Sequence, residues 1–150
     1  MKTVAPPCLH AYHTSAGSSG AYTAHVGQNS HRRSRPHRRD SPAAQPAPGA
    51  LLCRVSDIAD PGAKGFVFRE GEKLFMGFLV RQGAEVFGYI DRCPHAGLPL
   101  ATFGDRFLTR EGDLILCSSH GALFRPRDGL CIGGPCAGRA LWPWRVKVEG

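Results

Sequence analysis

The chain has 150 residues, of which 42% are hydrophobic, and a formal net charge of +7 at pH 7. This length gives room for one domain with an appendage. It has no stretch that is long and apolar enough to cross a bilayer, so membrane insertion is not expected.

Residues 1–50 differ in composition from the rest of the chain. They are rich in Ala, Pro, Ser, Gly and His, and they carry six basic side chains and a single acid, Asp40. Because they offer few large apolar side chains to offset the entropy cost of ordering, we expect residues 1–50 to form a disordered basic extension. The arginines between His31 and Arg39 are not interleaved with aromatic residues, which favours a solvated segment over a nucleic-acid contact. An organellar transit peptide and a start site assigned too far upstream are the other interpretations.

From Leu51 onward, short apolar runs alternate with Gly and charged pairs, which predicts a folded domain over residues 51–150. In chain order, the predicted strands are Gly65–Arg69, Lys73–Arg81, Ala84–Asp91, Asp113–Cys117, Ala122–Arg125, Gly129–Ile132 and Leu141–Glu149. Gln82-Gly83 predicts a hairpin, and Pro143 indicates an edge or strand-start position. No stretch of ten or more residues has a helical period. The predicted fold class is therefore all-β, as a small antiparallel barrel or sandwich.

Two short motifs each follow a predicted strand: Cys93-Pro94-His95 and, after a gap of 21 residues, Cys117-Ser-Ser-His120. From residue 51 onward the chain has two histidines, and both belong to these motifs. Two Cys and two His can hold a structural zinc ion or a 2Fe-2S centre with mixed ligands. One residue between Cys93 and His95 is tight for a single tetrahedral ion, but it suits ligands that reach different irons. From ligand type alone, zinc remains the alternative.

The motifs resemble those of the Rieske 2Fe-2S family over roughly residues 51–150, and Gly133–Gly138 resembles the proline loop that covers the cluster in that family. The resemblance implies one 2Fe-2S cluster per chain, bound by a subdomain of two loops. It assigns Cys93 and Cys117 to the inner iron, and His95 and His120 to the outer, solvent-facing iron. The gap between the motifs is longer than the family's commonest spacing. The extra length fits a hairpin around Thr102–Gly112.

Four residues distinguish the chain from Rieske proteins of the respiratory and photosynthetic cytochrome complexes. Leu98 and Ser119 stand where those proteins carry two cysteines that form a disulfide. Ala122 and Phe124 stand where those proteins have a Ser and a Tyr that donate hydroxyl hydrogen bonds to the cluster. Donors stabilise the electron-rich reduced state, so the resemblance places the potential toward the low end of about −150 to +300 mV.

The remaining cysteines are interpreted as structural. Cys53 lies in an apolar run that indicates core packing, and Cys8 lies in the extension and is interpreted as incidental. Cys131 and Cys136 flank the proline loop and have the chemistry of a redox pair or of extra ligands. Their position beside the motifs favours packing near the cluster, and a disulfide between them is not expected in a reducing compartment.

The resemblance implies a ferredoxin-like one-electron carrier that is not itself an enzyme, because the chain has no room for the second iron domain of an oxygenase. We expect it to be cytoplasmic and to pass electrons, through transient contacts, from a reductase, a flavoprotein, to an oxygenase or other terminal oxidoreductase. An apolar rim at Gly97–Pro99 and Gly121–Leu123 is the predicted docking surface. The alternatives are a small electron-transfer subunit of a reductase complex and a zinc-stabilised interaction module.

Overall fold

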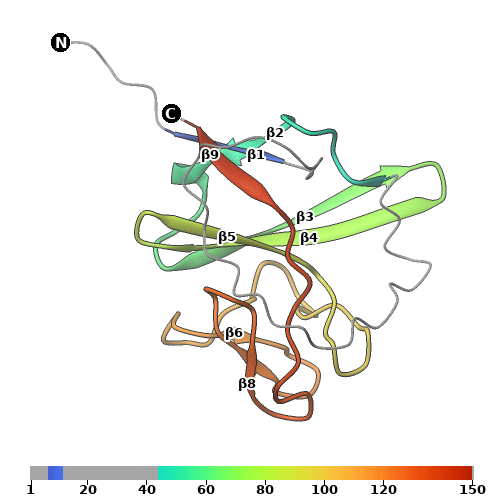
Figure 1. Cartoon of the computed structure of the whole chain (residues 1–150), viewed down its shortest axis with the longest axis vertical. Helices are drawn as coiled ribbons and strands as arrows, with labels where there is room; N and C mark the ends of the chain where they lie inside the picture. The colour runs from blue at the N-terminus through green and yellow to red at the C-terminus, as the bar shows by residue number, and fades with distance from the viewer. Residues whose placement is uncertain (1–6, 12–43, 150) are drawn as a thin grey trace.

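The computed structural model describes residues 7–11 and 44–149, which form three antiparallel sheets of three strands (Figure 1). The first sheet has the order β2 (Leu51–Arg54), β1 (Cys8–Ala11), β9 (Val146–Glu149). The second joins β3 (Gly62–Glu70), β4 (Lys73–Gln82) and β5 (Glu85–Ile90), and the third joins β6 (Ile115–Leu116), β7 (Leu123–Phe124) and β8 (Cys131–Gly133). A short 3-10 helix, η2 (Val55–Asp57), follows β2. The predicted all-β class is confirmed.

The predicted strands agree best in the middle sheet, where β3, β4 and β5 begin and end within about three residues of the expected bounds. The last predicted strand is shorter, since β9 starts only at Val146. Before it, the chain still runs along β5, because the Ile90 N–H donates to Trp142 O at 2.9 Å and the Trp144 N–H donates to Gly88 O at 2.8 Å. Pro143 lies between these two bonds and has no N–H to extend the ladder.

The first sheet corrects the expectation for the extension. Cys8–Ala11 is not disordered but forms the central strand between β2 and β9. Its Leu9 and Ala11 side chains are buried, and Ala44 packs in the same core as Leu9. Two inward-facing residues in a strand of four are too short a pattern to stand out in a Pro- and Gly-rich segment. Residues 1–6 and 12–43 lie outside the described residues.

Strand β4 separates two hydrophobic cores because its side chains alternate between the two faces of the sheet. Phe75 and Leu79 point into a core built around Leu9 and Trp144. Phe78 and Val80, on the opposite face, belong to a second core that also contains four cysteines. The small β6-β7-β8 sheet, which contributes Ile115, Phe124 and Cys131 to this second core, lies below the middle sheet in Figure 1. The buried strand β4 therefore contributes side chains to both cores.

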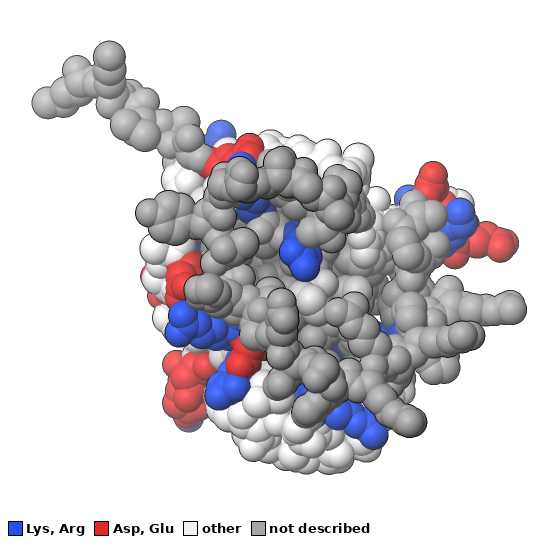
Figure 2. All heavy atoms as spheres, in the orientation of Figure 1, with Lys and Arg blue, Asp and Glu red and all other residues white. Residues whose placement is uncertain are grey.

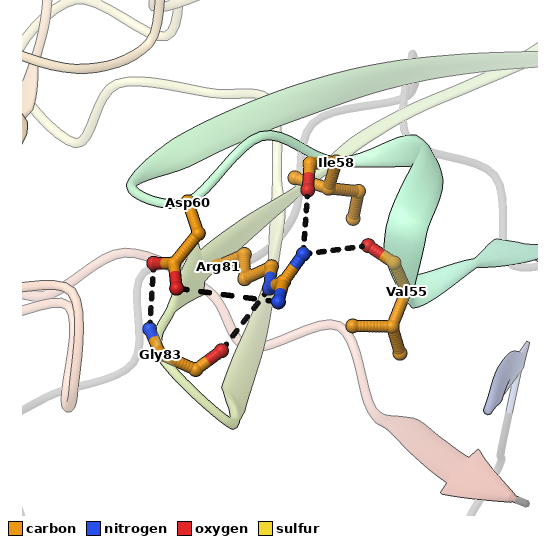
Figure 3. Close-up of polar contacts among 5 residues, drawn as sticks. All are labelled: Val55, Ile58, Asp60, Arg81 and Gly83. Atoms are coloured by element: carbon orange, nitrogen blue, oxygen red, sulfur yellow. Dashed lines mark hydrogen bonds and ion pairs between the residues drawn. The ribbon is translucent and has the colours of Figure 1, made fainter. Parts of the chain in front are cut away.

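Arg81 on β4 ties the segment after β2 to the β4–β5 hairpin (Figure 3). Its guanidinium donates to Val55 O at 3.3 Å, to Ile58 O at 3.0 Å and to Gly83 O at 3.1 Å. Asp60 accepts from the Gly83 N–H at 2.7 Å and lies 4.0 Å from the Arg81 Nη2 atom. One side chain therefore fixes a loop that has no strand partner of its own.

The described surface mixes both signs of charge. On the face in Figure 2, Lys and Arg side chains lie next to Asp and Glu side chains around the described part of the molecule. Within the residues that the structure describes, no helix has the length and apolar character needed to span a membrane.

Candidate metal centre

The two cysteine motifs form loops with the same backbone hydrogen bonds. In the first loop, the Cys93 N–H donates to Leu98 O at 2.7 Å and Cys93 O accepts from the Gly97 N–H at 2.8 Å. In the second, the Cys117 N–H donates to Ala122 O and Cys117 O accepts from the Gly121 N–H, both at 2.9 Å. Each loop therefore turns back at a glycine four residues after its cysteine.

These two glycines allow the turn because their backbone is left-handed, with φ of 72° at Gly97 and 69° at Gly121. The first loop follows β5 in the middle sheet and the second follows β6 in the small sheet, and both cysteines are buried in the same core. The histidines differ in offset, since His95 is two residues after its cysteine and His120 is three. The two loops therefore share one backbone turn, and each carries one imidazole.

Ser118 connects the second loop to the end of the first. Its backbone N–H donates to Leu100 O at 2.8 Å, and its hydroxyl donates to the same oxygen at 2.9 Å. The Ser118 Oγ atom also accepts from the Thr102 N–H at 3.1 Å. These bonds set the separation of the two loops.

The segment Gly133–Gly138, predicted to cover the cluster, packs on both ligand loops. A Cβ atom at Gly134 would lie 2.8 Å from the Ala122 Cα atom, so only glycine allows this approach to the second loop. The Arg139 guanidinium, just after the segment, donates to Pro94 O in the first loop at 3.0 Å. The proline loop, together with Arg139, therefore connects the first Cys/His loop to the second.

The four predicted ligands meet as two pairs. The Cys93 and Cys117 side chains are buried in one core and interact with each other. His95 and His120 are exposed, and their ring centroids lie 4.7 Å apart with the rings nearly perpendicular. Each loop thus contributes one buried thiol and one exposed imidazole.

The electrostatics of the Cys93 thiol follow from its burial. Desolvation raises its pKa, while the His95 backbone N–H, which donates to the sulfur, lowers it. Burial disfavours a charged thiolate at Cys93, and the hydrogen bond from the His95 N–H partly offsets this cost. A coordinated metal cation removes the thiol proton outright.

Cys131 and Cys136 lie in the same core as the two predicted ligand cysteines. The Cys136 thiol donates to the Cys131 Sγ atom at 3.2 Å, and Cys131 donates to Gly133 O at 3.2 Å. Burial, followed by the interaction with Cys131, raises the pKa of Cys136 to about 12. Cys136 also lies next to Cys93, and this contact lowers the pKa of Cys93. The expected packing near the ligand motifs is therefore accompanied by a specific thiol–thiol contact.

The arrangement has consequences for the choice of metal. Two thiols in one pair and two imidazoles in another fit a dinuclear centre in which each iron takes one pair. The chemistry and placement of the donors therefore fit a 2Fe-2S cluster.

Three features around the site went unrecognised in the sequence. Ser118 and Arg139 bridge loops that are distant in the chain, and nothing in their local sequence marks a partner. Arg92, next to Cys93, is buried and lies over the Trp142 ring, with 5.4 Å between its Cζ atom and the ring centroid.

Between the two motifs, the chain forms a turn at Thr109–Leu114, at the end of the range predicted for a hairpin. A bridge between Leu108 and Ile115 closes this turn.

Comparison with known proteins agrees with this geometry. The family profile of the Rieske [2Fe-2S] domain matches residues 50–147, about two thirds of the chain. A search of curated proteins found no match. The profile match decides between zinc and iron–sulfur in favour of the cluster. The chain belongs to the Rieske 2Fe-2S domain family, and it is an electron-transfer protein that binds a 2Fe-2S cluster.

Proposed function

We propose that Cys93 and Cys117 bind one iron of the cluster, that His95 and His120 bind the other, and that the protein is a ferredoxin-like carrier between a reductase and a terminal oxidoreductase. The observation that carries this proposal is that the two loops bring together one buried pair of thiols and one exposed pair of imidazoles. When bound, the cluster supplies a one-electron couple. The protein accepts one electron from the reductase and gives one to the acceptor.

The cysteines and the histidines contribute differently to electron transfer. The buried cysteines keep their sulfurs away from water, and the His95 N–H donates to Cys93 to offset the charge. The two imidazoles reach solvent, so a partner that docks over them would lie close to the bound cluster. Electrons therefore enter and leave past the histidine edges.

The docking surface is smaller than the predicted apolar rim. Leu98 in the first loop is 48% exposed, as expected, but Ala122 in the second loop is buried. Ile132 on β8, also 48% exposed, adds an apolar side chain next to the proline loop. A small surface of this kind suits brief contacts with a flavoprotein reductase and with an oxygenase or other acceptor.

The first test is the ligand set. We expect the anaerobically purified protein to contain two irons and two acid-labile sulfides per chain, and its dithionite-reduced form to give the EPR signal of mixed Cys/His ligation. Cys93→Ala should lose the cluster, whereas the matched control Cys53→Ala, in the other half of the fold, should keep it. Full cluster content in Cys93→Ala would contradict the assignment, as would zinc in place of iron in the native protein.

The second test concerns the partners. The reduced protein, immobilised through its amino groups, should capture a flavoprotein reductase transiently, with release as the salt concentration rises. Co-purification with a flavin- or haem-containing subunit through several columns would instead support the alternative of a subunit within a reductase complex.

A further inference from the structure

The proline loop brings a thiol against one of the proposed ligand sulfurs. Cys136 has two sulfur neighbours, Cys131 at 3.2 Å and Cys93. All three side chains are at most 2% exposed, so water does not compete for the Cys136 proton. The choice of acceptor therefore depends on the two sulfurs alone.

The loop holds Cys136 in a fixed position. Gly134 packs against the Ala122 backbone, and the Arg139 guanidinium anchors the far end of the loop on Pro94 O at 3.0 Å. Within the loop, the Arg139 N–H donates to Cys136 O at 3.0 Å, and the Gly138 N–H donates to Cys131 O at 2.9 Å. With both ends and its own carbonyl held, the residue can redirect its proton only by rotating its side chain.

Metal binding changes the relative strength of the two acceptors. A Cys93 sulfur bound to iron carries thiolate character, whereas Cys131 is not a proposed ligand and itself donates to Gly133 O at 3.2 Å. Hydrogen bonds to charged acceptors are roughly twice as strong as those between neutral groups. The Cys136 proton should therefore turn from Cys131 to Cys93 when the cluster is present.

We propose that the Cys136 thiol donates a hydrogen bond to the Cys93 sulfur in the cluster-bound protein, and that this bond raises the reduction potential. The inference rests on the proposed ligation by Cys93. Ala122 and Phe124 in the second loop have no hydroxyl groups, whereas Cys136 in the proline loop has a thiol that can donate. A donor to a ligand sulfur stabilises the more electron-rich reduced state.

The test compares three variants of the cluster-loaded protein in an EPR-monitored redox titration. We expect Cys136→Ala to shift the one-electron equilibrium about tenfold toward the oxidised form, which corresponds to ~59 mV. Cys136→Ser keeps a donor and should restore most of the shift. Cys131→Ala removes an equally buried thiol beside Cys136 and should leave the potential within a third of that shift.

A spectroscopic readout separates a hydrogen bond from packing. In resonance Raman spectra, protein produced in D₂O should show shifted Fe–S stretching bands, and part of this shift should vanish in Cys136→Ala but not in Cys131→Ala. Equal potentials in Cys136→Ala and the native protein would overturn the inference, as would equal shifts in both alanine variants. Recovery of Cys131 and Cys136 as a disulfide after denaturing alkylation of the native protein would also overturn it, because no proton would remain to donate.

These outcomes are distinct from failure of the proposed ligand set. If Cys93 is not a ligand, Cys93→Ala keeps its iron and sulfide. If only the thiol donor is wrong, Cys93→Ala loses the cluster while Cys136→Ala has the native potential.

Discussion

At the residue scale, Tyr89 shows how a single buried polar atom depends on its partner. Its hydroxyl donates to Pro126 O at 2.6 Å inside the core beneath the ligand loops. Burial, and secondarily the charge of Asp128, raises the pKa of Tyr89 well above its ordinary range. The phenol therefore stays protonated in the folded protein at pH values where an unfolded chain ionises.

We expect Tyr89→Phe to lower the free energy of unfolding by about 1–3 kcal/mol, because the buried Pro126 carbonyl loses its partner. In the native protein, the pKa of Tyr89 is higher in the folded state than in the unfolded state, so its contribution is complete below about pH 10 and is lost as the pH rises further. Urea denaturation at several pH values measures both effects. A native protein and a variant that lose stability equally above pH 10 would contradict this account.

At the scale of elements, the ligand loops repeat one turn on two strands, and the proline loop is the element that joins them. Its contact with the second loop depends on Gly134, where φ is 92° and a Cβ atom would lie 2.8 Å from Ala122 Cα. Gly138 in the same loop also has a positive φ, 84°, but a Cβ atom there would have no neighbour within 4 Å. The two positions share a left-handed backbone and differ in whether a Cβ atom would clash.

This difference makes a matched pair of variants. Both Gly134→Ala and Gly138→Ala should cost the strain of a left-handed non-glycine residue, about 1 kcal/mol or more. Only Gly134→Ala should also displace the loop from Ala122 and speed the loss of the cluster. The rate of this loss is measured as the bleaching of the visible absorption of the cluster in the presence of a chelator. Equal bleaching rates would show that the close approach at Gly134 does not matter.

At the scale of the whole molecule, the fold has two cores with β4 between them, and the site lies over one of them. The other core is closed by β1, whose Leu9 is fully buried although it lies far from the rest of the domain in sequence. Leu51 on the adjacent β2 is 62% exposed and provides a control of the same residue type.

We expect Leu9→Ala to destabilise the protein by about 2–5 kcal/mol through the cavity it leaves. Leu51→Ala should change stability by no more than about 0.5 kcal/mol. Thermal unfolding measures both, and the EPR signal of the folded variants should be unchanged, since the cluster lies over the other core. If Leu9→Ala were as stable as Leu51→Ala, β1 would not be part of the folded domain.

Several features were already determined by the sequence. The alternation of apolar residues in β3, β4 and β5 is long enough to specify strands and their faces, and Gln82-Gly83 marks the hairpin between β4 and β5. The Cys/His motifs indicated the chemistry of the site because ligand types and short spacings are local properties. The shorter strands β6 to β8 were located but overextended, since two or three residues carry little periodicity.

Only the tertiary structure decided which distant residues complete the domain and the site. The strand at Cys8–Ala11 joins the fold because β2 and β9 offer it two edges, which its own composition does not reveal. Cys136 lies next to Cys93 because Gly134 and Arg139 hold the proline loop on the two Cys/His loops. Such contacts join residues tens of positions apart, and their strength depends on burial and distance. Neither quantity is encoded by a local pattern.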